Sequence, residues 1–314
     1  MPYRPSVAIL GLVLVLAPTG ARADLVTTVE APFLGITHTH VSGTLPSGQA
    51  LAYDAVDVDL SAPGVHFLAS PGLPLAPGQV AGHARPQTTR EFVASAGAQV
   101  GINANFFASP TAPPFDAYKV NGFVASGGVV SAAEDGPGLN ISAGNAVTFF
   151  DRSPAGVPGF GPGNAVSGSV RLIRGGVLNP FAGDDRHART AIGLTAAGHL
   201  LLLTVDGKNP GHSDGLTLNA LELTLQSLGA VDAINLDGGG STTLVLARGG
   251  TPTVANVPSG DALFPVGTER PVAISLAVFA QAVPEPSALA LLTVGTAVGL
   301  GTRRARRRMS GRVE

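Results

Sequence analysis

The sequence predicts an α+β fold, a single domain built on a mixed, largely antiparallel β-sheet with a few helices. Predicted hairpins outnumber predicted crossover helices, which favours antiparallel pairing. Between residues 24 and 283 there is no internal repeat and no linker that marks a domain boundary. Hydrophobic residues make up 45% of the 314 residues, so the chain can bury a large core.

The first predicted elements are an alternating strand and a capped helix. Residues 52–60 (AYDAVDVDL) alternate apolar and acidic side chains, which is typical of a half-buried strand. Thr88 or Thr89 is a suitable N-cap for a short helix, and Gly97 ends that helix. A strand is expected next, at 99–103.

Two hairpins and an amphipathic helix follow. Residues 171–178 predict a hairpin that turns at two glycines, and 190–205 predict a second hairpin around an Ala-Ala-Gly turn. Thr217 caps a helix with leucines at three- and four-residue spacing, and Gly229 ends it. Further strands are expected at 231–236, 242–247 and 272–279. The Gly- and Pro-rich stretch 108–180 gives no prediction apart from the first hairpin.

Both ends of the chain have the pattern of export signals. Residues 1–23 combine Arg4, a short apolar run and an Ala-Arg-Ala cleavage site, as in a secretory signal peptide. Residues 283–314 contain Pro-Glu-Pro, an apolar run of 16 residues and a cluster of arginines. That run is marginal for a membrane span. The three parts resemble the PEP-CTERM sorting signal of Gram-negative bacteria, which implies an exosortase as partner, a transient membrane contact and a protein at the cell surface or released.

Composition excludes several classes of function. The formal charge is −2, but residues 24–283 carry 11 Lys and Arg against 19 Asp and Glu, a net charge of −8. Such an acidic body with 5% aromatic residues is not expected to bind nucleic acid. The chain has no cysteine, so thiol nucleophiles, thiolate metal sites and disulfides are excluded.

The most informative segment is INLDGGGSTTLV at residues 234–245, where an apolar strand ends at an aspartate and three glycines follow. Glycines allow a ligand to approach the backbone, and their N–H groups can bind an anion. The carboxylate can act as a nucleophile, base or metal ligand. The alternative is a tight turn with an Asx cap. The candidate residues are Asp237, Gly238, Gly239, Gly240, Ser241 and Thr242.

Three further segments contain candidate residues. Asn103 and Asn105 alternate with apolar residues, so both amides are expected on one strand face, where they suit sugar hydroxyls or phosphate oxygens. Arg189 enters a strand and can bind a phosphate in bidentate fashion. Asp206 ends a strand before a Gly-rich loop. The alternatives are capping amides, a surface ion pair and a turn aspartate.

Taken in order, these segments resemble one family, the phosphodiester glycosidases. The resemblance implies a catalytic domain over residues 99–280, preceded by a strand-rich part at 24–98. Its motifs lie at Asn103 to Phe107, Leu172 to Gly176, Arg189 to Gly193, Val205 to Gly207, Gly215 and Ala233 to Thr243, with a closing strand after Arg270-Pro271. Two positions depart from the family. Asn105 stands where Gly is usual, and Ala220 where Glu is common. Glu222 lies about 200° further round the helix and cannot replace that Glu.

The resemblance implies hydrolysis of a sugar-1-phosphodiester at the anomeric carbon, on an exopolysaccharide or envelope glycan. Asp237 would stabilise or attack that carbon, and Arg189 with the Gly238–Ser241 amides would hold the phosphate. Asn103 and Asp206 would orient sugar hydroxyls or water. One alternative is a non-catalytic surface protein that binds glycan. Another is a metal-assisted hydrolase in which Asp206, Asp214 and Asp237 bind Ca²⁺ or Mg²⁺; otherwise no cofactor is expected.

Overall fold

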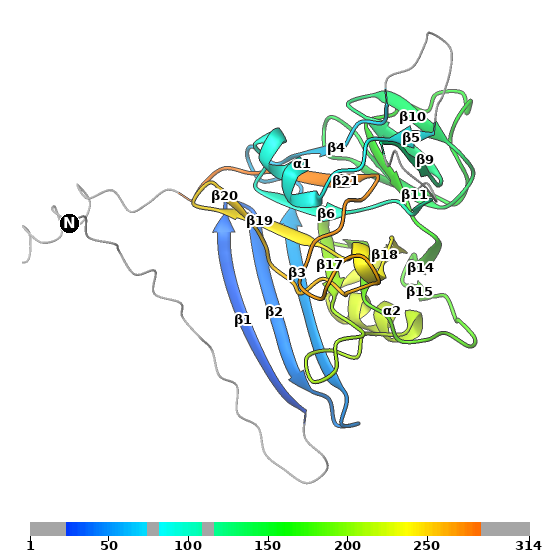
Figure 1. Ribbon diagram of the computed structural model, residues 1–314. Coiled ribbons are helices and arrows are strands. Elements are labelled where there is room, and N and C mark those ends of the chain that lie inside the picture. Colours follow the sequence, from blue (N-terminus) through cyan, green and yellow to red (C-terminus); the bar gives the residue numbers. More distant parts are fainter. Residues whose placement is uncertain (1–22, 74–81, 109–115, 284–314) are drawn as a thin grey trace, which may run out of the picture. The chain divides into compact units, whose positions relative to one another are not determined.

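The computed structural model describes residues 23–73, 82–108 and 116–283, and its largest element is an eight-stranded sheet (Figure 1). In spatial order the strands are β1 (Asp24–Phe33), β2 (Ile36–Thr44), β3 (Ala50–Asp59), β17 (His199–Val205), β16 (Arg189–Thr195), β18 (Ala230–Asn235), β14 (Val170–Arg174) and β15 (Val177–Leu178). Strand β3 pairs with β17, for example Val56 with Leu202, so the N-terminal strands continue the sheet that the later hairpins form.

A second sheet has five strands and packs against the first helix. Its order is β20 (Thr251–Val254), β19 (Leu244–Arg248), β6 (Val100–Asn103), β21 (Ser275–Phe279) and β4 (His66–Ala69). Helix α1 (Thr89–Ala96) has Thr88 as N-cap in a capping box and Gly97 as a left-handed C-cap, as predicted. It buries Phe92 and Val93 on this sheet, where a Cβ at Gly101 would approach Val93 Cγ2 to 2.2 Å.

Two further sheets, drawn mainly from the Gly- and Pro-rich middle of the chain and joined by β5 from before it, were not predicted from the sequence. One has the order β10 (Val129–Ala133), β9 (Phe123–Ser126), β13 (Asn164–Ser167), β11 (Gly138–Ile141) and β12 (Val147–Phe150). The other is β5 (His83–Ala84), β8 (Tyr118–Val120) and β7 (Phe107–Ala108). Their strands have two to five residues, which is too short to show a clear alternation in the sequence.

Helix α2 (Leu218–Ser227) packs on the eight-stranded sheet. Thr217 caps it, and its buried Leu221 and Leu225 pack with residues of β14, β16, β17 and β18. The helix ends before Gly229, which has a φ of +94°. Both predicted hairpins are present as β14–β15 and β16–β17.

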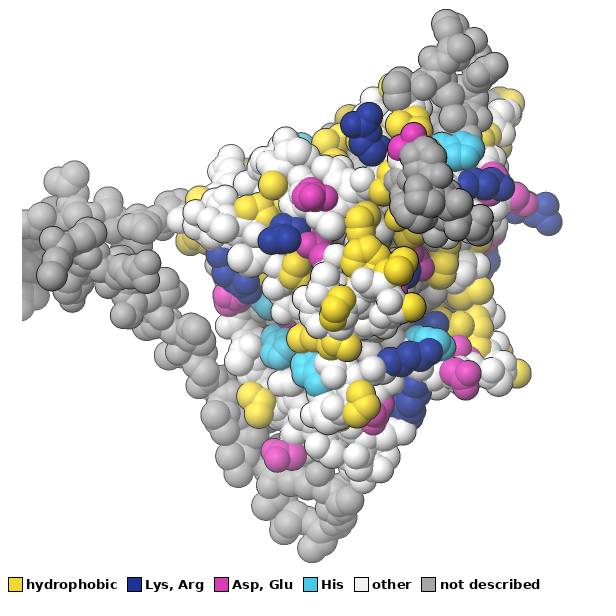
Figure 2. Space-filling model, viewed as in Figure 1, with side chains coloured by type: hydrophobic (Ala, Val, Ile, Leu, Met, Phe, Trp, Pro, Cys, Tyr) yellow, Lys and Arg dark blue, Asp and Glu magenta, His cyan; other side chains and the backbone are white. Residues whose placement is uncertain are grey.

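The predicted α+β class, with few helices and mainly antiparallel strands, is confirmed. Every strand pairing in the described residues is antiparallel, and the strands form four sheets rather than one mixed sheet. Charged side chains of both signs are interspersed on the face shown in Figure 2. Within the described residues no helix is long and apolar enough to cross a membrane. The predicted signal peptide and the PEP-CTERM-like segment lie almost entirely outside these residues.

Candidate functional site

Asp237 lies two residues after the end of β18, with its carboxyl group almost fully enclosed. The residue is 7% exposed, and its backbone N–H donates to the carbonyl of Ala104 at 2.9 Å. Burial raises the pKa of Asp237 to about 6, while hydrogen bonds from Ser241 and the Gly238 amide and the charge of Arg270 act in the opposite direction. A carboxyl group with such a pKa changes charge near neutral pH, which is a property of functional sites.

Arg270 is the partner of this carboxyl group. Its Nη2 lies 3.8 Å from Asp237 Oδ2 and donates to Ser241 Oγ at 2.6 Å, while Nη1 donates to Asp261 Oδ2 at 3.2 Å. The guanidinium lies over the Phe107 ring, 5.6 Å from its centroid. Sequence reasoning used Arg270 only to mark the last strand. The Arg270-Pro271 pair was used as the motif that precedes that strand. Nothing in the sequence spacing indicated that the Arg270 side chain reaches the Asp-Gly segment.

The three glycines form a turn rather than an open anion-binding loop. Residues Gly239–Ser241 are a 3₁₀ turn, η1, in which Gly239 has a φ of +58°. A Cβ at Gly238 would lie 2.5 Å from the carbonyl oxygen of Ala188, so this position requires glycine. The amides of Gly239, Ser241 and Thr242 already donate to backbone carbonyls, at 2.9 to 3.2 Å. Two of the amides predicted to hold the phosphate, those of Gly239 and Ser241, are therefore engaged by the fold.

Asn103 is a buried cross-link behind Asp237. Its Nδ2 donates to the Asp237 carbonyl at 2.6 Å, and its Oδ1 accepts from Thr190 Oγ1 and from the amide of Thr243. The side chain is fully buried and all these partners belong to the protein. The geometry thus gives Asn103 a positioning role for Asp237 rather than a contact with sugar hydroxyls.

Asn105 and Thr242 are buried as well. Strand β6 ends at Asn103, so the expected common strand face does not extend to Asn105. The Asn105 amide donates to the carbonyl of Asn121 and accepts from the amide of Ser167. The Thr242 side chain is 0% exposed. The bulk that Asn105 adds in place of the family's glycine is therefore used within the fold.

Arg189 is held in an ion pair at the start of α2. Its Nη2 lies 2.8 Å from Asp184 Oδ1, and its Nε donates to the Leu216 carbonyl at 3.0 Å. Asp184 Oδ2 also accepts from the amide of Leu218. The structure therefore matches the ion-pair alternative more closely than the proposed phosphate contact.

Asp206 is fully enclosed and ties two loops together. Its Oδ2 lies 2.7 Å from His212 Nε2, and its Oδ1 accepts from Asn256 Nδ2 at 3.0 Å. The Val257 amide donates to the same carboxylate, and Asn256 also bonds the Thr242 carbonyl. Burial raises the pKa of Asp206, and these bonds oppose the shift. The sequence did not single out His212 or Asn256, whose pairing with Asp206 arises only in the fold.

The carboxylates of the metal alternative do not come together as a ligand set. In the described ranges no group of three or more His, Asp or Glu side chains is arranged to hold a metal ion. Asp214 Oδ2 instead accepts from the amide of Ala50 at 3.1 Å. The fold therefore offers this alternative no support at Asp206, Asp214 and Asp237.

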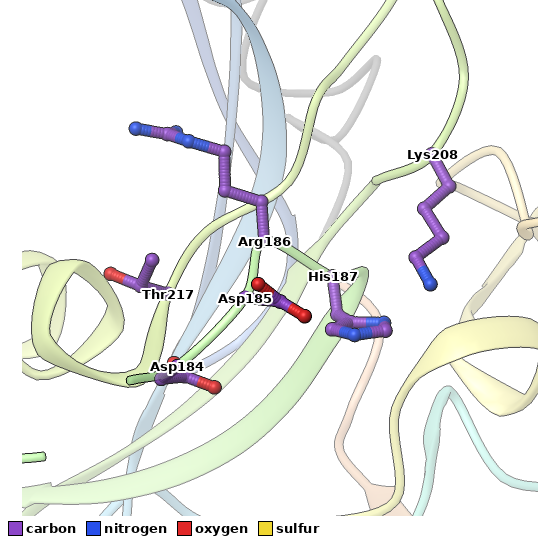
Figure 3. Close-up of a pocket in the computed structure, with 6 residues that line it drawn as sticks. All are labelled: Asp184, Asp185, Arg186, His187, Lys208 and Thr217. Atoms are coloured by element: carbon purple, nitrogen blue, oxygen red, sulfur yellow. The ribbon is translucent and has the colours of Figure 1, made fainter. Parts of the chain in front are cut away.

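A cleft of about 470 Å³ lies beside the residues that precede β16. Its lining residues are Asp184, Asp185, Arg186, His187, Lys208 and Thr217. Figure 3 shows the side chains of His187 and Lys208 pointing into the same space, with Arg186 directed away from them. The next residue after His187 is Ala188, whose carbonyl accepts from the Gly239 amide at 2.9 Å. One backbone hydrogen bond therefore joins the glycine turn to Ala188, the residue next to the cleft residue His187.

Glu222 lies on another face of α2. Its Oε2 accepts from the amide of Asn179 at 3.0 Å, beyond the β14–β15 hairpin, and the residue is 4% exposed. Ala220, in the first turn of α2, packs against the core. Glu222 is thus held by the β14–β15 region, and the expectation that it does not replace the family's glutamate stays a prediction.

Sequence comparisons relate this arrangement to enzymes of known name. Residues 96–279 match the family model described as phosphodiester glycosidase. A segment is 44% identical over 72 residues to the Bos taurus N-acetylglucosamine-1-phosphodiester alpha-N-acetylglucosaminidase, covering 23% of this chain and 12% of that protein. The Mus musculus enzyme of the same name is 43% identical over 72 residues, which cover 23% of this chain and 13% of that protein. The matched segment is a small part of these relatives' length.

Solved structures share the fold at low identity. The zebrafish N-acetylglucosamine-1-phosphodiester alpha-N-acetylglucosaminidase catalytic domain, auto-inhibited by its pro-peptide, aligns with a TM-score of 0.59 at 22% identity, covering 82% of this chain and 88% of that chain. A Burkholderia pseudomallei protein aligns with a TM-score of 0.58 at 14% identity, over 87% and 99% of the two chains. Since the family model covers more than half of its residues, the chain belongs to the phosphodiester glycosidase family.

Proposed function

We propose that this protein is an exported hydrolase that cleaves a sugar-1-phosphodiester at the anomeric carbon. The observation that supports this most directly is the enclosed Asp237, with its pKa raised to about 6, beside the Arg270 guanidinium. The carboxylate suits a cation-like sugar carbon, and the guanidinium suits the phosphate. Family membership supports the same class of reaction.

The proposed reaction requires little protonation of the leaving group by a general acid. The bond between the anomeric carbon and the phosphate oxygen breaks, and its electron pair stays on the phosphate. A water oxygen bonds to the carbon and releases its proton to solvent. Because a phosphomonoester leaves readily, a general acid is less necessary than in ordinary glycosidases. Ionised Asp237 stabilises the developing positive charge, and Arg270 takes the phosphate-holding role that the sequence suggested for Arg189.

The neighbouring cleft is the proposed place for the sugar. Lys208 adds positive charge at its wall, and the His187 imidazole, whose pKa is lowered by burial and by the charges of Lys208 and Arg189, adds a neutral hydrogen-bonding group. Asp185 adds hydrogen-bond acceptors for sugar hydroxyls. Asn103 holds the main chain of Asp237, and Asp206 holds the loops beside the turn. Both act as positioning residues in this proposal.

The first test is turnover of an N-acetylglucosamine-1-phosphate ester, because the relatives' printed names give this class of substrate. We expect the wild type to release free sugar and Asp237→Asn to lose at least about 100-fold in kcat/KM, since a group acting on the transition state is removed. Glu222→Gln is the matched control. It also neutralises a buried carboxyl group with a raised pKa, but outside the site. Full activity of Asp237→Asn would refute the assignment.

The same experiment separates the hydrolase from the glycan-binding alternative. A non-catalytic surface protein would bind the ester without releasing sugar, and Asp237→Asn would leave its affinity unchanged.

We further propose that the terminal segments direct export to the cell surface through an exosortase-type enzyme. The mature protein would then begin at Asp24, which N-terminal sequencing of the exported form tests; retention of residues 1–23 would contradict export by this signal.

A further inference from the structure

The loop of residues 258–267, here called the rim loop, exposes apolar side chains. Leu263 is 80% exposed and Val266 is 50% exposed, and Leu263 is the most exposed large hydrophobic side chain of the described residues. Figure 2 shows hydrophobic side chains gathered at the centre of this face, where Figure 1 draws the orange loop that precedes β21. Single exposed hydrophobic residues are ordinary, but two in one short loop beside a site indicate a contact surface.

The rim loop is fixed by its own hydrogen bonds. The Gly267 amide donates to the Pro258 carbonyl at 2.9 Å and closes the base of the loop. Asp261 Oδ1 accepts from the amides of Leu263 and Phe264, at 2.8 and 2.9 Å. The apolar side chains are thus presented by an ordered backbone, which reduces the entropy lost when a ligand binds.

The rim loop is also joined directly to the site. Asp261 Oδ2 accepts from Arg270 Nη1 at 3.2 Å, on the side of the guanidinium away from Ser241. A Cβ at Gly240 would lie 3.3 Å from Asp261 Oδ2, so the loop packs against the glycine turn. Buried Ser259 fastens the loop to the Gly207 carbonyl at 2.7 Å.

We propose that the rim loop binds an apolar alcohol group esterified to the substrate phosphate, so that the preferred substrates are sugar-1-phosphate esters of long-chain alkyl alcohols. This inference rests on the proposed function. A phosphodiester carries two organic groups on either side of its phosphate. In this proposal the sugar carbon lies at Asp237 and the phosphate at Arg270, and the second group continues toward Asp261, which belongs to the same loop as the exposed Leu263 and Val266.

The products follow from the bond that breaks. Water adds to the anomeric carbon, the sugar leaves as a free sugar, and the alkyl group leaves as its phosphomonoester. The alkyl group takes no part in bond breaking, so its contact with the rim loop affects binding of the ester and of the monoester product alike. Binding of octyl phosphate therefore reports on the loop independently of turnover.

The test compares methyl and octyl esters of N-acetylglucosamine-1-phosphate, both kept below micellar concentration. We expect the wild type to prefer the octyl ester by roughly tenfold or more in kcat/KM, the size expected when a few methylenes are buried. Leu263→Ser with Val266→Ser should abolish this preference and leave the methyl ester unchanged. Val129→Ser, which removes a 70% exposed valine on β10, is the matched control.

Several outcomes would overturn the inference. These are equal turnover of both esters by the wild type, equal loss on both esters in the double variant, or a change only in vesicle binding or self-association. If the wild type hydrolyses neither ester, the proposed function fails, and binding then decides the role of the loop. Octyl phosphate should still bind more tightly than methyl phosphate, and only when Leu263 and Val266 are present. Equal binding of the two phosphates would overturn the role of the loop as well.

Discussion

Arg270 Nη2 lies 3.8 Å from Asp237 Oδ2 and bonds Ser241 Oγ at 2.6 Å, so the hydroxyl is a shared partner of the two charged groups. The charge of the guanidinium lowers the pKa of Asp237, but burial outweighs it and leaves a pKa of about 6. The site is therefore neither a closed ion pair nor a free carboxyl group. Its charge state depends on a balance that Arg270 can shift.

The pH profile of the enzyme should report this balance. Because ionised Asp237 is required at the anomeric carbon, kcat/KM should rise with pH through about 6 and then level off. Arg270→Gln removes a positive charge that favours the ionised form, so the rise should move to higher pH. Arg270→Lys keeps the charge and should move it less. A rise that stays in place in Arg270→Gln would show that Asp237 is not the titrating group.

Folding stability should depend on the same carboxyl group. Its pKa in the folded state lies above the unfolded value of 3.8, so the folded protein binds more protons between about pH 4 and 6 and loses stability as the pH rises through that range. Asp237→Asn removes the cost of burying the charge. At pH 7 we expect a free energy of unfolding about 3 kcal/mol higher than in the wild type. Urea unfolding at pH 7 and pH 4 tests this, since the difference should vanish at the lower pH.

Both helices, the two hairpins and strands β18, β19 and β21 could be predicted from local sequence patterns, whereas the first two strands, β1 and β2, were not predicted. The residue types that cap the helix at Thr89–Ala96, a threonine before it and a glycine after it, can be recognised in the sequence. The hairpins likewise have glycines at their turns. The two sheets formed mainly by 108–180 could not be predicted, because strands of two to five residues depend on partners far away in sequence. For the same reason the start of the last strand was placed too early. Val272 forms only an isolated bridge with Gln87, and β21 begins at Ser275.

The site was predictable only in part. Asp237 was indicated by its place between a buried strand and three glycines, which is a local signal. The partners of each polar group were not, since Arg270, His212 and Asn256 reach the site through loops without a repeating pattern. Whether the remaining candidate side chains bind a ligand or only bond within the protein depends on their burial. Polar types such as Asn103 and Arg189 suit both ligand binding and internal hydrogen bonds, and the sequence does not show which groups face solvent.

Loss of the Asn103 amide should weaken the fold around Asp237. Asn103→Ala leaves the Asp237 carbonyl and the Thr243 amide without this partner in a fully buried place. We expect a loss of about 2–4 kcal/mol in unfolding free energy, since buried polar groups are left unsatisfied. Asn121→Ala, at an exposed amide, should stay within about 0.5 kcal/mol. Equal stability of the two variants would contradict the positioning role.

The Asp206–His212 pair should behave unequally under mutation. Asp206→Ala removes an enclosed carboxylate that accepts from His212, Asn256 and the Val257 amide, so we expect a loss of about 3 kcal/mol or more. His212→Gln removes a side chain that is 32% exposed and should cost less than about 1 kcal/mol. Thermal unfolding of the two variants measures both. A large loss on His212→Gln would mean that the imidazole, rather than the carboxylate, holds the loops together.

Mutations in the Arg189–Asp184 ion pair test whether Arg189 has a structural role or binds phosphate. Arg189→Met leaves a carboxylate that is only 17% exposed without its partner, so we expect a loss of about 3 kcal/mol in unfolding free energy. Adding Asp184→Asn removes the stranded charge and keeps an acceptor for the Leu218 amide, so much of the stability should return. If Arg270 rather than Arg189 holds the phosphate, the double variant should retain a KM close to that of the wild type, whereas Arg270→Lys should raise it. Recovery of stability with a KM raised tenfold or more would instead restore Arg189 to the substrate site.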